Sequence, residues 1–223
     1  MLTSLVGSEM CIRDRSFKLS RKLKSWLGPQ LILVLVLIAF PLSIDISQYD
    51  LDKFYFSIIV ISLMMTAFIS TEGMFEEDFE DGSLEQEFLL EQDFYKIVLS
   101  KMLIYVFFIG IPIALIGSLF LITNGADFDD LPKVFSILCL SNILLFNLFS
   151  FGNALSINKG AMLGVLTSLP LALPVIILLG RAVRTIQYGE GFFSIIILMS
   201  GISLIVLAIM PIVISAALKT HID

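Results

Sequence analysis

The chain has 223 residues, of which 57% are apolar and only 15% are charged. A soluble domain contains about 45–50% apolar and about 25% charged residues, and a chain of this length cannot hide such an apolar excess in one core, so a soluble globular enzyme is all but excluded. The formal net charge of -6 argues equally against a nucleic-acid binder, because binding to phosphates requires a large basic surface.

Residues 1–15 read as a sequence foreign to the protein. Residues 9–15, Glu-Met-Cys-Ile-Arg-Asp-Arg, resemble the translation of a transposase adapter used in DNA library preparation. Such a segment is set aside before the fold is considered, as any added scar is. We therefore expect residues 1–15 to be a sequence artefact that replaces a few natural residues. The alternative is a genuine N-terminal tail, and neither interpretation gives Cys11 a function.

A short basic amphipathic segment at residues 16–24 leads into the first apolar run. Apolar Phe17, Leu19 and Leu23 are interleaved with cations there. Such a segment can lie in the headgroup plane, with its cations toward anionic lipid and a tryptophan at the interface. The plain basic flank of a first membrane helix would produce the same pattern. The candidate membrane-surface residues are Lys18, Arg21, Lys22, Lys24 and Trp26.

Six uncharged apolar runs follow, each long enough to cross a bilayer, which takes roughly 20 residues. They cover residues 25–44, 54–71, 102–126, 134–158, 160–180 and 191–218. None alternates polar and apolar residues, which argues against a β-barrel. The first run is longer than a signal-peptide core and lacks an Ala-x-Ala cleavage site, so we take it as a retained span. The sequence predicts an all-α integral membrane protein, with six transmembrane helices in residues 25–218 and a tail at 219–223.

The distribution of lysine and arginine predicts the orientation of these spans. On the side of the N-terminus lie Lys18, Arg21, Lys22, Lys24, Lys96, Lys101, Lys159 and Lys219. The other side carries Lys53, Lys133, Arg181 and Arg184. The excess on the first side predicts that both termini are cytoplasmic. The loop predicted at 181–190 is the exception: its arginines lie at an ordinary headgroup boundary, bind something anionic, or belong to a re-entrant segment.

The longest hydrophilic segment, residues 72–101, lies between the second and third apolar runs. It holds ten acids, namely Glu72, Glu76, Glu77, Asp78, Glu80, Asp81, Glu85, Glu87, Glu91 and Asp93. Phe75 and Phe79 share one helical face, as do Leu84 and Phe88, because each pair is four residues apart. Ser83 precedes Gln86 by the three residues of a capping box. We expect two short amphipathic helices around an Asp-Gly turn at residues 81–82, the second beginning at Ser83.

This acidic segment has two readings on the cytoplasmic face. It is a solvated surface, or it is the docking site of a cytosolic protein. Anionic lipid repels its acids, and exposed Phe and Leu side chains need a protein surface to cover them. A partner with an apolar groove and a basic rim would satisfy both conditions, so the sequence favours docking.

Polar residues recur along the fourth run, and two prolines interrupt the fifth. Ser136, Asn142, Asn147, Ser150 and Asn153 fall within an arc of about 140° on one helix. They line a cavity or make hydrogen bonds between helices, and we favour the hydrogen bonds. Pro170 and Pro174 are expected to kink the fifth span, which suits a helix that moves. No run contains a charge, which argues against a proton-coupled transporter.

The segment after the second run also resembles a known family. Residues 75–86, Phe-Glu-Glu-Asp-Phe-Glu-Asp-Gly-Ser-Leu-Glu-Gln, look like the signature loop of the haem exporter protein B family (CcmB) of bacterial cytochrome c biogenesis. Two further matches are residues 40–44, Phe-Pro-Leu-Ser-Ile, and residues 169–174, Leu-Pro-Leu-Ala-Leu-Pro. The resemblance runs from about residue 17 to the C-terminus. Residues 91–93, Glu-Gln-Asp, depart from it, because family members commonly carry prolines there.

The resemblance implies the permease subunit of an ABC-2-type exporter in the bacterial inner (cytoplasmic) membrane. A separate ABC ATPase subunit would dock on the cytoplasmic loop, so residues 72–101 would be the coupling segment. The complex would include a haem-handling membrane protein, and ATP hydrolysis would drive release of a haem-loaded chaperone for cytochrome c maturation. The implied ATPase-coupling residues are Phe75, Asp78, Phe79, Asp81, Gly82, Ser83, Leu84, Glu85 and Gln86.

The residues themselves add two restrictions. The sequence has no Gly-x-x-x-x-Gly-Lys-Ser/Thr run, so ATP would bind to the partner subunit and the chain would not itself be an enzyme. Haem iron needs an axial ligand such as histidine, and the single histidine is His221 near the C-terminus, so we expect no directly bound cofactor and no metal. Two alternatives stay open: a permease exporting another lipid-like substrate, and a membrane scaffold without transport.

Overall fold

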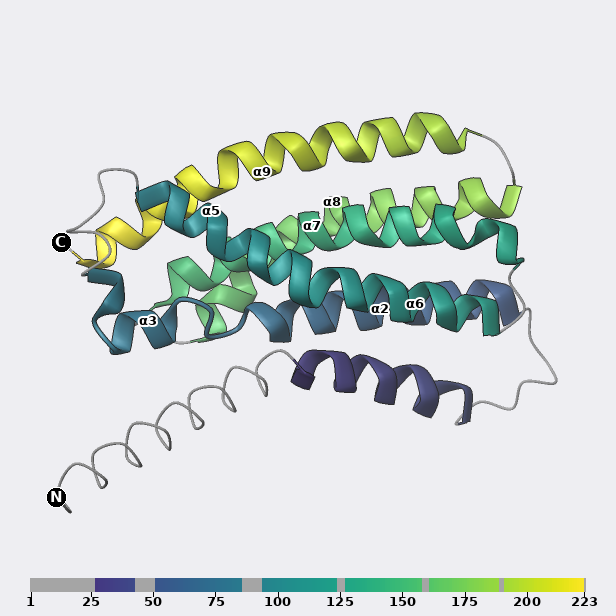
Figure 1. Ribbon diagram of the computed structural model, residues 1–223, viewed down its shortest axis with the longest axis horizontal. Helices are drawn as coiled ribbons and strands as arrows, with labels where there is room; N and C mark the ends of the chain where they lie inside the picture. The colour runs from purple at the N-terminus through teal and green to yellow at the C-terminus, as the bar shows by residue number, and fades with distance from the viewer. Residues whose placement is uncertain are drawn as a thin grey trace, which may run out of the picture.

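The computed structural model describes residues 27–42, 51–85, 94–123, 127–157, 161–188 and 191–222, and their regular structure is entirely helical (Figure 1). A first helix, Leu27–Leu42, precedes the labelled elements. These are α2 (Leu51–Thr71), α3 (Glu76–Glu80), α5 (Phe94–Tyr105), η2 (Val106–Gly110), α6 (Ile111–Thr123), η3 (Phe128–Asp130), α7 (Leu131–Ser156), α8 (Ala161–Tyr188) and α9 (Phe192–Ile222). The prediction of an all-α fold therefore holds for the described residues.

Four helical stretches of the described chain are long and apolar enough to cross a membrane. They are Phe94–Thr123, Phe128–Ser156, Leu166–Ile186 and Phe192–His221. Two shorter apolar helices, Leu27–Leu42 and Tyr55–Thr71, correspond to the first two predicted spans. Each predicted apolar run thus lies on a helix, and the chain is a multi-pass membrane protein.

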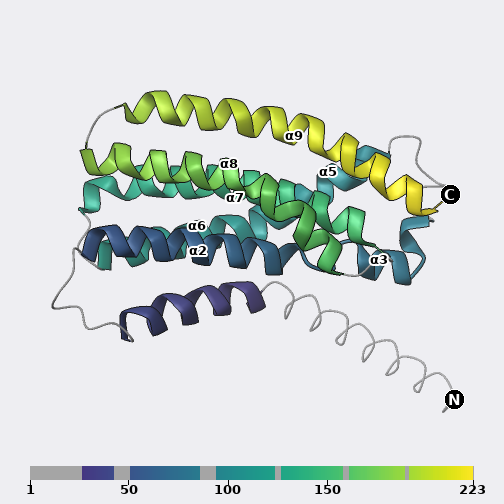
Figure 2. The same cartoon turned by 180° about the vertical axis from the view of Figure 1, so that it is seen from behind.

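Successive long helices run in alternating directions, so their ends gather at two opposite ends of the bundle (Figures 1 and 2). One end, called here the α3 end, holds α3, the start of α5 and the C-terminal part of α9. The opposite end holds the start of α7, the end of α8 and the start of α9. This alternation is what short connections between apolar helices produce.

Helix α7 forms the centre of the bundle. Its side chains from Leu144 to Ser150 are all buried, and it packs against α8, α9, α6 and α2. Contact between α7 and α8 is close at Gly152, because a Cβ atom placed there would lie 2.8 Å from the carbonyl oxygen of Gly164. Small residues permit such an approach of two backbones, which is the usual packing mode of membrane helices.

Helix α9 lies at the edge of the bundle and is much more exposed. Its exposed apolar side chains are Phe193, Ile197, Leu198, Leu204, Ile205, Ile209, Ile212 and Val213. Large apolar side chains on the outside are expected where lipid, rather than water, surrounds a helix.

Several helices extend past the charges that bound the predicted spans, and α5 and α8 extend furthest. The third span was predicted to begin at residue 102, but its helix begins at Phe94 and includes Lys96 and Lys101. The fifth was predicted to end at residue 180, but α8 continues to Tyr188. An uncharged run measures the part of a helix that lies in lipid, whereas the hydrogen-bonded helix continues into the interface, where charges are tolerated.

The extension of α8 corrects the prediction of a loop at residues 181–190. Arg181 and Arg184 lie on the helix, and only residues 189–191 separate α8 from α9. Three residues are too few for a re-entrant segment, so that alternative is wrong. Helix α8 also continues through Pro170 and Pro174, both exposed. The kink expected there stays a prediction.

Candidate functional site

One turn before α3 and one turn after it place this short helix at the end of the bundle. Met74 N–H donates to the Thr71 carbonyl at 3.1 Å, and Gly82 N–H donates to the Phe79 carbonyl at 3.2 Å. Gly82 has φ of 68°, a backbone conformation that other residues adopt only with strain. The next helical turn begins at Ser83, so the predicted Asp-Gly turn and the predicted helix start are both confirmed.

Ser83 also bonds back to α3. Its hydroxyl donates to the carbonyl of Asp78 at 3.1 Å, which ties the second turn back to α3. The other half of the predicted box, Gln86, lies outside the described residues, as does Phe88.

A separate apolar cluster lies beneath α3, and we call it the α3-end cluster. It consists of Met74, Phe75, Leu84, Phe94, Val98, Met102, Ala154, Ile157, Ile214 and Leu218, with Phe79 packed against it. Phe75 is 2% exposed and Leu84 is 3% exposed. The expectation that a docked partner must cover these two side chains is therefore wrong. Helices α5, α7 and α9 of the same chain cover them, because all three reach this end of the bundle.

Lys101 of α5 contacts α3. Its ammonium group forms an ion pair with the carboxylate of Asp78 and lies 5.3 Å from the ring centroid of Phe75. Both charged side chains are partly shielded, with 24% of Lys101 and 36% of Asp78 exposed. In the sequence, Lys101 is only one of the basic residues that predict the orientation. The overlooked signal is a lysine placed within the third apolar helix, where only an acid or an aromatic ring nearby would favour its charge.

The acids of this region face outward. Glu72, Glu76, Glu80, Asp81 and Glu85 are all exposed, while the apolar residues between them point into the α3-end cluster. Short amphipathic segments of this kind bury their apolar side against the protein and present their charges to the solvent. The result is an acidic outer surface packed on the ends of three helices.

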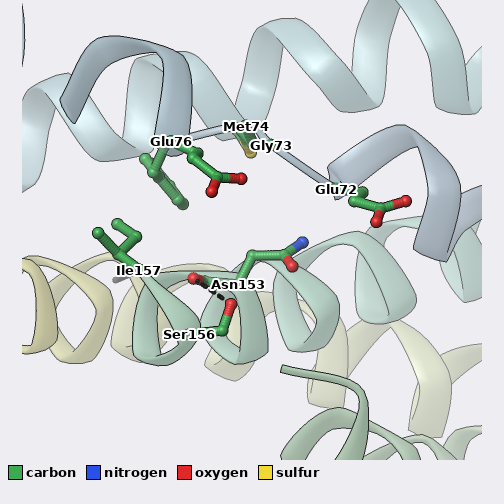
Figure 3. Close-up of a pocket in the computed structure, with 8 residues that line it drawn as sticks. Glu72, Gly73, Met74, Glu76, Asn153, Ser156 and Ile157 are labelled. Carbon is green, nitrogen blue, oxygen red and sulfur yellow. Dashed lines mark hydrogen bonds between the residues drawn. The ribbon is translucent and has the colours of Figure 1, made fainter. Parts of the chain in front are cut away.

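A small cavity of about 20 Å³ lies between the turn that precedes α3 and the C-terminal end of α7 (Figure 3). It is lined by Glu72, Gly73, Met74, Phe75, Glu76, Asn153, Ser156 and Ile157. Asn153 Nδ2 donates to the Thr71 carbonyl at 2.6 Å and Ser156 donates to the Asn153 carbonyl at 2.9 Å. The cavity has room for about one or two waters, whereas sites for small organic ligands measure about 300–1,000 Å³. It cannot receive haem.

The polar stripe of α7 serves mainly to join helices. Asn142 Nδ2 donates to the Gly110 carbonyl at 2.8 Å, and Ser150 donates to the sulfur of Met74 at 3.4 Å. Asn147 Nδ2 bonds within α7, to the Ile143 carbonyl at 2.6 Å. Exposed Ser136 likewise bonds its own helix. Asn142, Ser150 and Asn153 thus bond outside α7, as the favoured prediction of hydrogen-bonded packing expects, and Asn153 also lines the small cavity.

A second, open hollow lies at the opposite end, between α8 and α9. Its volume is about 430 Å³, and Arg181, Arg184, Thr185, Gly191, Ser194, Ile195 and Leu198 line it. Both arginines are exposed, and the Thr185 hydroxyl is committed to the Ala182 carbonyl at 2.7 Å. A headgroup boundary and the binding of an anionic group therefore both stay open for the two arginines.

The remaining site predictions concern surface residues and metals. Lys18, Arg21, Lys22, Lys24 and Trp26 lie outside the described residues. Within the described part of the chain, no group of three or more His, Cys, Asp and Glu side chains is placed to hold a metal ion.

Known proteins match this chain over most of its length. The family described as "CcmB protein" matches residues 9–221. The chain is 28% identical to "Heme exporter protein B" of Pseudomonas aeruginosa over 194 residues, which are 86% of this chain and 87% of that protein. It is 25% identical to the protein of the same name from Haemophilus influenzae over 205 residues, 91% and 93% of the two chains. The protein of that name from Paracoccus denitrificans is 28% identical over 166 residues, 74% and 76% of the two chains.

The family match thus includes the α3 end, all four long helices and both shorter ones. Its start at residue 9 falls within residues 1–15, which were expected to be foreign. Because the match covers nearly the whole length, the chain belongs to the CcmB protein family.

Proposed function

We propose that this chain is the permease subunit of an ABC transporter complex required for cytochrome c maturation, in the haem export step. A separate ATPase subunit would hydrolyse ATP, and the chain would convert that reaction into motion of its helices. Membership of the CcmB family and the relatives named "Heme exporter protein B" support the haem-export assignment. The sequence has no P-loop, which supports a transport subunit without its own ATP site.

The observation that supports coupling best is the construction of the α3 end. Exposed Glu76, Glu80, Asp81 and Glu85 form an acidic surface, and the apolar residues between them are anchored in the α3-end cluster. That cluster contains residues of α5, α7 and α9. A basic partner that binds and moves this surface would therefore move three membrane helices with it, which a freely solvated loop could not do.

We further propose that the chain crosses the bacterial inner membrane six times, with both termini and α3 in the cytoplasm. The alternating helix directions support this topology, because α3 and the C-terminal part of α9 lie at the same end (Figure 2). The helices Leu27–Leu42 and Tyr55–Thr71 would be the first two spans. The greater number of Lys and Arg residues predicted on this side agrees with a cytoplasmic location.

Haem would be handled by other members of the complex. A haem-handling membrane protein and a haem chaperone, whose release in the loaded form would depend on ATP, complete the proposed assembly. The cavity at the α3 end is too small for a porphyrin, and the single histidine lies near the C-terminus. We therefore propose that the chain itself binds no cofactor directly and transmits motion instead.

The test compares two double charge reversals in the tagged full-length chain in native membranes. D81K/E85K reverses the acidic surface, and D127K/D129K reverses two exposed acids at the opposite end. We expect the first variant to insert normally, lose the copurifying ATPase subunit and abolish cytochrome c maturation. The second should retain both, because its acids lie on the other side of the membrane.

Mass spectrometry of the material that copurifies with the unmodified chain completes the test. A P-loop ATPase together with haem-handling membrane proteins would support the proposal. Normal cytochrome c maturation by D81K/E85K would refute the coupling role of the acidic surface. Purification of an ATPase without haem-handling proteins would refute the haem-export assignment and favour the export of another lipid-like substrate.

A further inference from the structure

The helical span Phe94–Thr123 contains a break in its hydrogen-bond ladder. Residues Val106–Gly110 form a π-helical turn, in which Ile111 N–H donates to the Val106 carbonyl, five residues earlier. Pro112 follows at once. It has no N–H group to offer the carbonyl of Phe108, and its ring would collide with that carbonyl in a regular α-helix. Wide turns of this kind relieve the collision and recur where helices bend or move.

Side chains of two other helices bond to this turn. Gln30 Nε2, from the helix Leu27–Leu42, donates to the Phe108 carbonyl at 3.2 Å. Asn142 Nδ2, from α7, donates to the Gly110 carbonyl at 2.8 Å. Gln30 therefore supplies the hydrogen bond that Pro112 cannot make. In the apolar part of a membrane no water is available to a backbone carbonyl, and a side-chain donor from a neighbouring helix is one way to satisfy it.

The turn also separates two packing units. Before it, Phe94, Val98 and Met102 of α5 belong to the α3-end cluster. After it, Ile113, Ala114 and Leu121 of α6 belong to the larger cluster of buried apolar side chains, which we call the main core. Helix α5 packs chiefly against α9, whereas α6 packs against α7 and α2. In Figure 1 the chain accordingly crosses from the α9 side of the bundle to the α2 side at this point.

One polar atom at the turn has no partner in this arrangement. Asn142 is fully buried, and among the described residues its Oδ1 has no hydrogen-bond donor. An unpaired buried carbonyl is costly. Asn142 therefore holds the turn through its Nδ2 group alone.

We propose that Val106–Gly110 is the joint about which α5 moves relative to α6 and the main core, and that Gln30 and Asn142 are the positioning residues that hold it. This inference rests on the proposed coupling function, and it names the element through which the coupling passes. The joint exists because Pro112 prevents a regular helix, and its two side-chain donors keep the break satisfied in lipid.

The first experiment measures the joint without reference to transport. Hydrogen exchange is followed in the assembled complex in lipid nanodiscs, for the unmodified chain and for P112A. Alanine supplies the missing N–H to the Phe108 carbonyl, so amides 106–111 should exchange about tenfold more slowly in P112A, because local opening then breaks an additional bond. The matched control is P211A, which removes a proline inside α9 and should leave these amides unchanged. Equal exchange of amides 106–111 in the unmodified chain and in P112A would overturn the proposal.

The second experiment tests the joint in function. P112A, Q30L and P211A are compared for assembly, ATP turnover and cytochrome c maturation. We expect P112A and Q30L to assemble and hydrolyse ATP, but to yield about fivefold less mature cytochrome c per ATP hydrolysed, since the joint is either stiffened or unsupported. P211A should behave like the unmodified chain. Normal yield per ATP in both P112A and Q30L would overturn the proposal.

The two experiments separate failure of the joint from failure of the proposed function. If the unmodified complex supports no ATP-dependent maturation, the proposed function is wrong, and the coupling inference that rests on it is wrong as well. If it does support maturation and the exchange of P112A equals that of the unmodified chain, only the joint is wrong.

Discussion

Lys101 on α5 and Asp78 on α3, 23 residues apart in sequence, form an ion pair that joins a surface segment to a membrane helix. The same ammonium group lies over the ring of Phe75. One lysine thus contacts both the charged and the apolar side of the α3 segment. This contact fixes the position of the acidic surface relative to α5. We therefore regard Lys101 as part of the proposed coupling site.

Replacing Lys101 with methionine should loosen the α3 segment while the bundle stays folded. The pair is partly exposed, so its loss should cost at most about 1 kcal/mol of overall stability. The local effect should be larger, because α3 has only five residues and depends on tertiary contacts. Hydrogen exchange of amides 74–82 should become severalfold faster.

The matched control for this prediction is K133M, which breaks the Lys133–Asp130 pair at the opposite end of the bundle. It should leave amides 74–82 unchanged. The charge swap D78K/K101D should recover part of the protection, because it restores the ion pair without the contact to the Phe75 ring. Unchanged exchange of amides 74–82 in K101M would show that α3 does not depend on Lys101.

Close packing of α7 on α8 should make Gly152 intolerant of a large side chain. Even a Cβ atom there would lie 2.8 Å from both the Gly164 carbonyl oxygen and the Ser168 Cβ atom, and neither is the free end of a flexible chain. G152L should therefore cost about 1–3 kcal/mol or more, because the two helices must move apart. Thermal unfolding of the purified protein in detergent measures this loss.

Gly201 provides the control for Gly152. A Cβ atom at Gly201 would meet nothing within 4 Å, so G201L should leave the unfolding temperature nearly unchanged. Equal unfolding temperatures for G152L and G201L would mean that α7 and α8 are not in close contact at this position.

The proposed orientation can be tested with single cysteines. In a background in which both cysteines of the chain are replaced by alanine, E80C and D129C place thiols at exposed positions at the two ends of the bundle. A membrane-impermeant maleimide added to spheroplasts should label D129C at once, and E80C only after the membrane is permeabilised. The reverse labelling pattern would place α3 outside the cytoplasm and would contradict docking of an ATPase there.

Much of the candidate site could be predicted from local sequence. The Asp-Gly turn at residues 81–82 and the helix start at Ser83 follow from backbone rules that act over a few residues. The burial of Phe75 and Leu84 could not be predicted in the same way. Whether an amphipathic helix covers its own protein or awaits a partner depends on what lies beneath it, and here the ends of α5, α7 and α9 do.

The helix boundaries show a related limit. Charges mark where a span leaves the hydrocarbon, so the apolar runs were located correctly. Helices α5 and α8 nevertheless continue beyond Lys101 and Arg181, because a helix does not end where lipid ends. The role of Lys101 was missed for this reason, since its partner Asp78 lies in a segment that the apolar pattern treats as separate.

The sequence by itself determined that the chain is a helical membrane protein with an acidic turn after its second apolar run, since hydrophobic length, charge position and glycine chemistry are local properties. Only the tertiary structure decided which side chains meet. It brings Lys101 to Asp78, Asn142 to Gly110 and Gln30 to Phe108. Lipid does not specify such pairs by hydrophobicity, because every apolar surface is satisfied equally well, so they arise from packing and from the need of each buried polar group for a partner.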